Sequence, residues 1–262
     1  MNKTQPVLFL SHGGPTLAIE NSHASQFMKL LGGTLNKPKA IVIFSGHLDS
    51  DDDVVITSGA SPSVIYDFYG FPKPLYELTY PAPGAPDLAN KIADMVSASG
   101  YKAVLDEDLG WDHGVWIPLR LIYPDADIPV VQVSISSKQG AKMNYELGKV
   151  LAPLREENVL LIGSGAITHN LREIFSRQKT PNGSAMAEAF TDWIAHKLEN
   201  KDHEAVVNFL TDAPNARFNH PTDDHFLPLV AVLGASGKDD AVRIHQSWQD
   251  DKLLAMDAYR FG

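Results

Sequence analysis

The chain has 262 residues, of which 44% are hydrophobic and 21% charged, proportions that are ordinary for a globular protein. Its formal net charge of −10 argues against a nucleic-acid surface and against binding to anionic membranes, because both require a basic patch. The absence of cysteine excludes disulfides, a thiol nucleophile and cysteine-ligated zinc or iron–sulfur sites.

The N-terminal segment does not resemble a targeting sequence. The stretch "MNKTQPVLFLSH" lacks a basic region followed by a long apolar run. No apolar run in the chain approaches the roughly 18 residues of a membrane span. We therefore expect a cytoplasmic protein with no membrane partner, and the net charge is compatible with a monomer and with a homo-oligomer.

Short apolar runs rich in valine and isoleucine predict buried strands. The clearest are Val7–Ser11, Ala40–Ser45, Val130–Ile135 and Val159–Gly163, and weaker ones are Val54–Thr57, Lys102–Leu105 and Val242–His245. Continuous rather than alternating apolarity indicates strands that are covered on both faces, as in a parallel sheet.

Helices are predicted between and after these runs. Apolar residues spaced three and four apart mark Pro86–Ser97, Lys142–Glu156 and Ser184–Glu199. A fourth predicted helix is Asp223–Gly234, with Thr222 as its N-cap. The alternation predicts a single α/β domain over residues 1–262, in which helices flank a mostly parallel central sheet.

Three histidines directly follow predicted strands, namely His12, His47 and His169. Because ligands bind at the carboxyl ends of strands in open α/β sheets, we expect these side chains to converge on one crevice. Small residues stand beside each of them, such as Gly13 after His12, and glycine lets the backbone approach a ligand or metal closely.

Three further histidines have sequence neighbours that bear on a role in the site. His113 lies between two tryptophans in "GWDHGVW", and His225 lies near the expected start of the last predicted helix. The positive end of a helix disfavours the imidazolium, so we expect His225 to be neutral and able to bind a metal. His220 leaves two interpretations open: it lines the site, or it hydrogen-bonds in the turn before the helix.

These residue types favour a metalloenzyme. Neutral imidazoles bind Fe(II) and Zn(II), catalytic sites typically use three protein ligands, and further histidines serve as acid or base. Other motifs are weak, because "SHGGPT" lacks the lysine of a phosphate loop and "GSGAITH" lacks the GxSxG spacing of a serine hydrolase. Residue types alone therefore predict a histidine-rich metalloenzyme without specifying its reaction.

Six segments together resemble the class III extradiol ring-cleavage dioxygenases, most closely the 4,5-DOPA dioxygenase branch. They occur in the order typical of that family and extend over residues 7–236. The segments are "LFLSHGGPTLAIE", "PKAIVIFSGHLDS", "IYDFYGFPKPLYELTYPAPG", "DLGWDHGVWIPLRLIYPDADIPVVQVSI", "LIGSGAITHNLRE" and "HPTDDHFLPLVAVLGA".

The resemblance implies a role for each histidine. His12, His47 and His225 match the metal-ligand positions, with His225 standing where more distant class III enzymes supply a glutamate. His169 matches the acid/base histidine, and His113 matches a histidine that contacts substrate or oxygen. The metal implied for activity is Fe(II), while three neutral ligands suit Zn(II) equally well.

The resemblance also implies a substrate and a substrate wall. The substrates are a catechol such as DOPA and O2, which is inserted next to the diol to give a ring-opened semialdehyde. Tyr66, Phe68 and Phe71, in an aromatic, proline-rich loop, match part of the substrate wall, and Gly13 turns the chain away from the open face of the metal. Two alternatives stay open, a zinc-dependent hydrolase and a non-enzymatic protein that binds metal or catechol.

Overall fold

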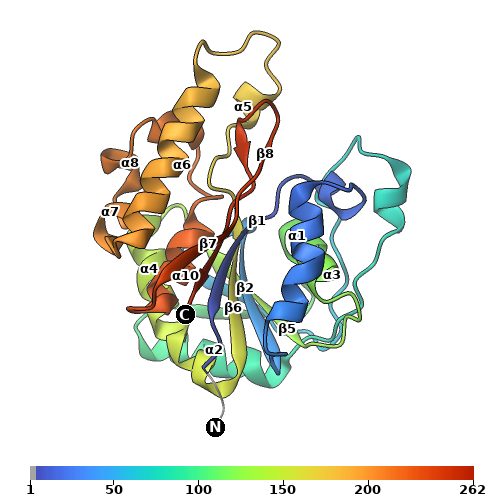
Figure 1. Cartoon of the computed structure of the whole chain (residues 1–262). Helices are drawn as coiled ribbons and strands as arrows, with labels where there is room; N and C mark the ends of the chain where they lie inside the picture. Colours follow the sequence, from blue (N-terminus) through green and yellow to red (C-terminus); the bar gives the residue numbers. More distant parts are fainter. Residues whose placement is uncertain (1–3) are drawn as a thin grey trace.

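In the computed structural model, which describes residues 4–262, eight strands form one sheet (Figure 1). In spatial order they are β4 (Ala103–Asp106), β3 (Val54–Thr57), β5 (Val130–Ile135), β2 (Ala40–Asp49), β6 (Val159–Gly165), β1 (Val7–Ser11), β10 (Ala258–Phe261) and β7 (Ala241–His245). A separate two-stranded hairpin consists of β8 (Trp248–Gln249) and β9 (Leu254–Ala255).

The centre of the large sheet is parallel, as the sequence predicts. The strands β5, β2, β6 and β1 pair in parallel in that order. Both edges are mixed, because β3 pairs antiparallel with β5 and β10 pairs antiparallel with β1 and β7. The prediction of a mostly parallel central sheet is confirmed, and the antiparallel strand β10 is an addition.

Helices cover both faces of this sheet. The longer ones are α1 (His23–Leu31), α2 (Pro86–Ala98), α3 (His113–Ile122), α4 (Gly140–Leu151), α6 (Gly183–Glu199) and α10 (Leu227–Ser236). Short helices are α5 (Leu171–Ile174), α7 (His203–Val207), α8 (Phe209–Asp212) and α9 (Ala216–Asn219). Short 3₁₀ segments are η1 (Pro15–Ala18), η2 (Gly32–Thr34), η3 (Lys73–Glu77) and η4 (Ala152–Glu157).

Successive side chains of the central strands enter two hydrophobic cores. In β1, Val7 and Phe9 face the core covered by α2, α4, α6 and α10, whereas Leu8 and Leu10 face the core covered by α1 and α3 (Figure 1). All four side chains are fully buried. Burial on both faces explains why the apolar pattern of this strand is continuous rather than alternating.

Two predicted helix bounds are wrong, and a proline accounts for each. The predicted helix Lys142–Glu156 ends at Leu151 and continues as the 3₁₀ segment η4, because Pro153 cannot donate the next helical hydrogen bond. The predicted helix Asp223–Gly234 begins only at Leu227, where Pro228 occupies the first turn. Thr222 is therefore not its N-cap.

The helices α4 and α10 cross at unusually short range. A Cβ atom on Gly148 would lie 1.7 Å from the carbonyl oxygen of Ala231, and one on Gly234 would lie 1.9 Å from that of Tyr145. Every residue of α10 is buried, so this contact anchors a helix that has no solvent-facing side. None of the helices within residues 4–262 is long and apolar enough to cross a membrane.

We expect Gly148→Ala to destabilise the protein by about 1–3 kcal/mol, because the added methyl group forces α4 away from α10. Chemical denaturation followed by circular dichroism measures this change. Gly33→Ala is the matched control, since a Cβ at Gly33 meets nothing within 4 Å, and its effect should stay within about 0.5 kcal/mol. Equal stability of the two variants would contradict the close packing of these helices.

Candidate active site

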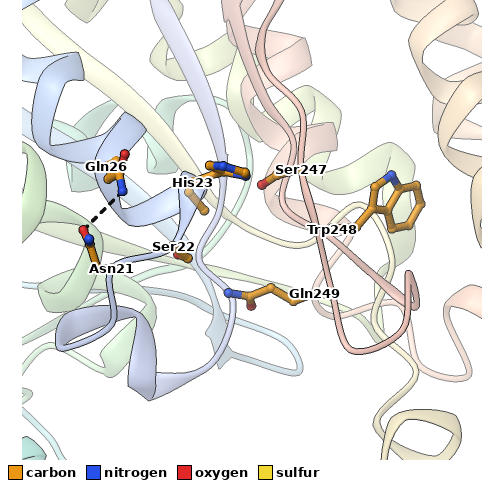
Figure 2. Close-up of a pocket in the computed structure, with 8 residues that line it drawn as sticks. Asn21, Ser22, His23, Gln26, Ser247, Trp248 and Gln249 are labelled. Atoms are coloured by element: carbon orange, nitrogen blue, oxygen red, sulfur yellow. Dashed lines mark hydrogen bonds between the residues drawn. The ribbon is translucent and has the colours of Figure 1, made fainter.

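Two cavities share the side chain of Gln249. The smaller, about 280 Å³, lies between the start of α1 and residues 247–249, as Figure 2 shows. The larger, about 820 Å³, lies at the carboxyl ends of the central strands and is lined by five histidines: His12, His47, His113, His169 and His225. All five are among the six histidines that the sequence singles out, so the larger cavity is the candidate site.

Each histidine reaches the cavity from a different element. His12 directly follows β1, and His169 follows β6 after a short connection. His113 is the first residue of α3, and His225 lies in the turn that precedes α10. The convergence of strand ends that the sequence predicts is therefore present.

His47 lies within a strand rather than after one. The predicted strand Ala40–Ser45 continues to Asp49, and its register with β5 shifts between Phe44 and Asp49. Such a bulge bends a strand and re-aims its side chains. The apolar pattern stops before Gly46 and His47, so the sequence alone placed the strand end too early.

The turn that carries His225 rests directly on the end of β6. The backbone N–H of Ala166 donates to the His225 carbonyl oxygen at 2.9 Å. A Cβ atom on Gly165 would lie 2.1 Å from that same oxygen. A glycine at the end of β6 is therefore required for His225 to come this close to the strand ends.

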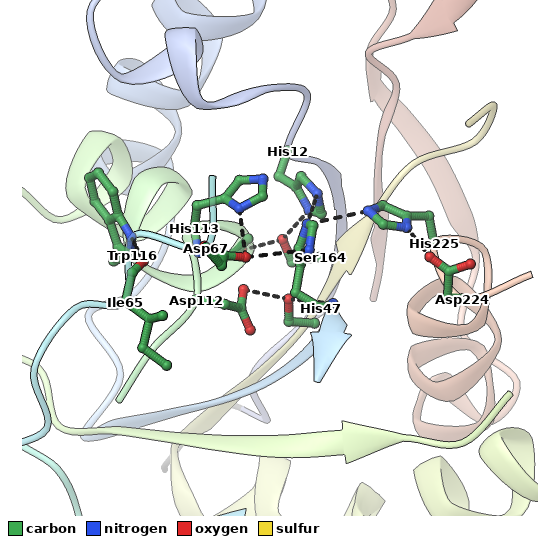
Figure 3. Close-up of polar contacts among 12 residues, drawn as sticks. His12, His47, Ile65, Asp67, Asp112, His113, Trp116, Ser164, Asp224 and His225 are labelled. Atoms are coloured by element: carbon green, nitrogen blue, oxygen red, sulfur yellow. Dashed lines mark hydrogen bonds and ion pairs between the residues drawn. The ribbon is translucent and has the colours of Figure 1, made fainter. Parts of the chain in front are cut away.

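Three ring nitrogens converge at the centre of the site (Figure 3). The Nε2 atoms of His12 and His47 are 3.1 Å apart, and those of His47 and His225 are 3.3 Å apart. With metal–nitrogen bonds of about 2.0–2.1 Å, two ligands of one tetrahedral ion have nitrogens roughly 3.3 Å apart. The two nitrogen pairs that share His47 are thus spaced as two ligands of a single ion would be.

A serine fixes which nitrogen of His12 carries the proton. The Ser164 hydroxyl donates its only hydrogen to the Gly114 carbonyl oxygen, and it lies 3.0 Å from Nδ1 of His12. Its oxygen must therefore accept from the His12 Nδ1–H. The Nε2 atom of His12 is then left with a lone pair that is free to bind a metal.

Carboxylates do the same for His225 and His113 (Figure 3). Asp224 accepts a hydrogen bond from Nδ1 of His225. Asp67 lies 2.9 Å from Nδ1 of His113 and 3.5 Å from Nδ1 of His47. Burial alone would raise the pKa of Asp67, but its hydrogen bonds with His113 and the charges of both rings hold that pKa below its usual value.

Burial keeps the cluster uncharged at neutral pH. Burial first, and then the neighbouring imidazoles, holds the pKa of His12 and of His225 well below the ordinary value. The pKa of His47 is lowered for the same reasons. With their Nδ1–H groups directed outward, His12 and His225 present unprotonated Nε2 atoms to the ring of His47, an arrangement that a cation between the three rings would stabilise.

His169 lies against this cluster without a fixed partner. Its ring stacks on that of His225, with centroids 3.5 Å apart and planes 9° from parallel. Within residues 4–262, its ring nitrogens have no hydrogen-bond partner. Burial lowers its pKa to about 4; the carboxylate of Asp224 opposes this shift, and the neighbouring rings of His47 and His113 add to it. His169 is therefore neutral at pH 7 and able to accept a proton inside the cavity.

Comparison with known proteins gives the family of this chain. Residues 6–262 match the family described as the catalytic LigB subunit of aromatic ring-opening dioxygenase. The "4,5-DOPA dioxygenase extradiol" of Beta vulgaris is 41% identical over 97% of this chain and 95% of its own length. The Escherichia coli K12 protein of the same name is 37% identical over 98% of this chain and 94% of its own length.

The chain belongs to the LigB family of ring-opening dioxygenases. A crystal structure of an uncharacterized Escherichia coli K12 protein has the same fold, with a TM-score of 0.80 and 33% identity over 98% of this chain and all of the other. Membership of the LigB family makes this protein an oxidoreductase of the extradiol dioxygenase type.

Aromatic side chains form one wall of the LigB-type cavity. Phe68 and Phe71 line it, and the ring of Phe68 meets that of His113 edge-on with centroids 5.8 Å apart. Tyr66 lies behind this wall, where its hydroxyl donates to the Leu78 carbonyl oxygen at 2.8 Å. Gly13 also lines the cavity, and its φ of +61° is a conformation that favours glycine.

His220 lies outside the cavity of this LigB protein. It is fully buried beside Phe190, Phe209 and Phe226, and its Nε2–H donates to the Ile167 carbonyl oxygen at 2.7 Å. The interpretation that His220 lines the site is therefore wrong, and its side chain does form a hydrogen bond, but with the segment after β6 rather than within the turn before α10. The contact fixes the segment that leads to His169.

Sequence reasoning missed the groups that orient the histidines. These are Asp67, Ser164 and Asp224. Asp224 carried a local signal, because it directly precedes His225. Ser164 and Asp67 are distant in sequence from the rings that they contact, so only the folded chain reveals them.

We expect the metal-free LigB protein to lose stability as the pH falls from 6.5 towards 4. Burial lowers the pKa of His220 from 6.5 to about 4, so in this window the unfolded chain binds a proton that the folded chain does not. The full loss from His220 alone is about 3 kcal/mol. Urea denaturation between pH 7.5 and 4.5 measures it.

The exposed His196 provides the control for this measurement. His196→Ala should leave the pH dependence of unfolding unchanged. An unfolding free energy that stays constant between pH 7 and pH 5 in the wild-type protein would contradict the buried, neutral state of these histidines.

Proposed function

We propose that this protein is an Fe(II)-dependent extradiol dioxygenase that cleaves the ring of a catechol such as DOPA with O2, giving a ring-opened semialdehyde. In this proposal His12, His47 and His225 hold the metal. The observation that carries it is the convergence of their three Nε2 atoms, at 3.1 and 3.3 Å, in a cavity of about 820 Å³.

The donor set fits a catalytic metal ion. Three neutral imidazoles leave positions free for the two catechol oxygens and for O2. Bound Fe(II) would supply the redox step between catechol and O2, which Zn(II) cannot supply because it has no redox chemistry. Zn(II) fits the same three nitrogens, so the identity of the bound metal decides between an active and an inactive protein.

His169 is suited to remove a proton from the catechol. It is neutral at pH 7 and stacks on His225, which places it beside the metal ligands. A catecholate binds a cation better than the neutral diol does, so a base at this position favours substrate binding in the reactive form. The same ring can return the proton when the cleaved product forms.

His113 is suited to contact substrate or oxygen. Its Nδ1 and its backbone N–H both contact Asp67, at 2.9 and 3.0 Å, so the ring is held from two points. Its other ring nitrogen stays free for an oxygen atom of the bound reactants. A fixed polar group of this kind stabilises developing charge without having to reorganise. Phe68 and Phe71 would exclude water from the reacting ring.

We expect protein reconstituted anaerobically with Fe(II) to consume O2 and form a yellow product when it meets L-DOPA. Zn(II)-loaded protein should show neither, because the three histidines then hold an ion without redox chemistry. An oxygen electrode and absorbance spectroscopy measure both. The opposite pattern, with hydrolysis of esters or amides by the zinc form and no O2 uptake by the iron form, would favour a zinc hydrolase.

Two alanine variants distinguish the proposed proton-accepting role of His169 from the proposed metal-binding role of His225. His169→Ala should lower turnover by about 10²- to 10⁴-fold while the protein retains its metal. His225→Ala should lose bound metal, as measured by elemental analysis of the reconstituted protein. His196→Ala, at an exposed position on α6, is the control for both. Loss of metal from His169→Ala would contradict the proposed roles.

A further inference from the structure

The cavity wall beyond the histidines carries negative charge without a matching cation. Its lining contains the carboxylates Glu20, Asp67 and Asp250. None of the lining residues, all within the described part of the chain, is lysine or arginine. Asp67 is already engaged by His113. Glu20 and Asp250 are therefore the carboxylates that can meet the part of a substrate that does not react.

Glu20 is held in place by neutral donors. Its carboxylate accepts from the Ser22 hydroxyl and from Nε2 of Gln249, both at 2.7 Å, and from the Thr16 hydroxyl at 3.4 Å. It forms no ion pair with any of the residues 4–262. Its position is thus fixed while its charge is left without a counter-charge.

The contact with Gln249 joins two distant parts of the chain. Figure 2 shows the Gln249 side chain extending from the C-terminal hairpin towards the segment that carries Ser22. Residues of the loop between His12 and Glu20 line the same wall of the cavity, including Thr16. One continuous segment therefore leads from the histidine cluster to Glu20.

Asp250 contributes less to this wall than Glu20 does. It is exposed on the hairpin, and burial of part of its side chain raises its pKa. The ammonium group of Lys179 also acts on Asp250, although it donates to the carbonyl oxygens of Glu173 and Ile174 and does not line the cavity. Glu20 is therefore the main negative charge on this wall.

We propose that Glu20 selects catechols whose side chain carries an ammonium group, and that the cavity disfavours side chains that carry only a carboxylate. This inference rests on the proposed dioxygenase function. A catechol held through its two oxygens at the histidines extends its side chain along the wall. There an ammonium group forms a charge-assisted hydrogen bond with Glu20, whereas a carboxylate meets a like charge.

The test compares three catechols of similar size: dopamine, 4-ethylcatechol and 3-(3,4-dihydroxyphenyl)propionate. With the Fe(II)-loaded protein, we expect kcat/KM for O2 uptake to fall in that order, by about 10-fold or more between the first and the last. The difference should lie mainly in KM and should shrink at high salt. Equal values for the three catechols would overturn the inference.

Variants at Glu20 test whether this residue is responsible. Glu20→Gln should lower the ratio of dopamine to propionate kcat/KM to near one, and Glu20→Asp should keep most of the preference. Glu199→Gln, at an exposed position on α6, should keep the whole preference. Thermal unfolding checks that each variant is folded. If the ratio of dopamine to propionate kcat/KM is unchanged in folded Glu20→Gln protein, another residue causes the preference for dopamine, and the proposed role of Glu20 is wrong.

A binding measurement separates this inference from the proposed function. Calorimetric titration of the Zn(II)-loaded protein with the same catechols gives affinities without turnover, and dopamine should bind more tightly than the propionate. If no catechol is consumed by the iron form, the dioxygenase proposal fails. If catechols are consumed but dopamine and the propionate bind and react alike, the selectivity proposal fails alone.

Discussion

The candidate site depends on one constraint, the level at which three parallel strands end. Ser45 of β2 pairs with Ser164 of β6, and Ser11 of β1 pairs with Gly165 of β6. This register brings the residue after Ser11, which is His12, level with the bulged end of β2. The turn before α10 then rests on Gly165. A shift of one residue in either pairing would turn these side chains to the opposite face and scatter the cluster.

Charged rings packed this closely would strongly destabilise the cavity, and the fold avoids this at His12 and His225 in two ways. Burial disfavours the imidazolium, which the lowered pKa values of His12 and His225 reflect. Hydrogen-bond acceptors placed behind the rings then decide where the remaining proton lies. Ser164 does this for His12 with a neutral hydroxyl, whereas Asp224 does it for His225 with a carboxylate. The chemistry of the site is therefore set as much by these acceptors as by the histidines.

The sequence predicted the parts of this protein whose signal is local. The strands Val7–Ser11 and Val130–Ile135 match the structure, because burial on both faces leaves a continuous apolar run. The convergence of the strand-end histidines followed from the general placement of sites in α/β sheets. By contrast, β10 was missed because its few residues gain their burial only by pairing with β1 and β7. The start of α10 was misplaced because polar Asp223 and Asp224 fit a helix N-terminus as well as they fit the turn that carries His225.

The converging rings are widely separated in sequence, and this affects whether the chain folds before or after it binds a metal ion. His12 lies near one end of the sequence and His225 near the other, and both reach the cavity only when β1, β6 and the turn before α10 have come together. An unfolded chain offers a metal ion no comparable set of neighbouring nitrogens. The free energy of metal binding would then stabilise the folded state and hardly affect the unfolded state. The ion would bind to the protein after it has folded and would stabilise the folded state, rather than act as a template around which the chain folds.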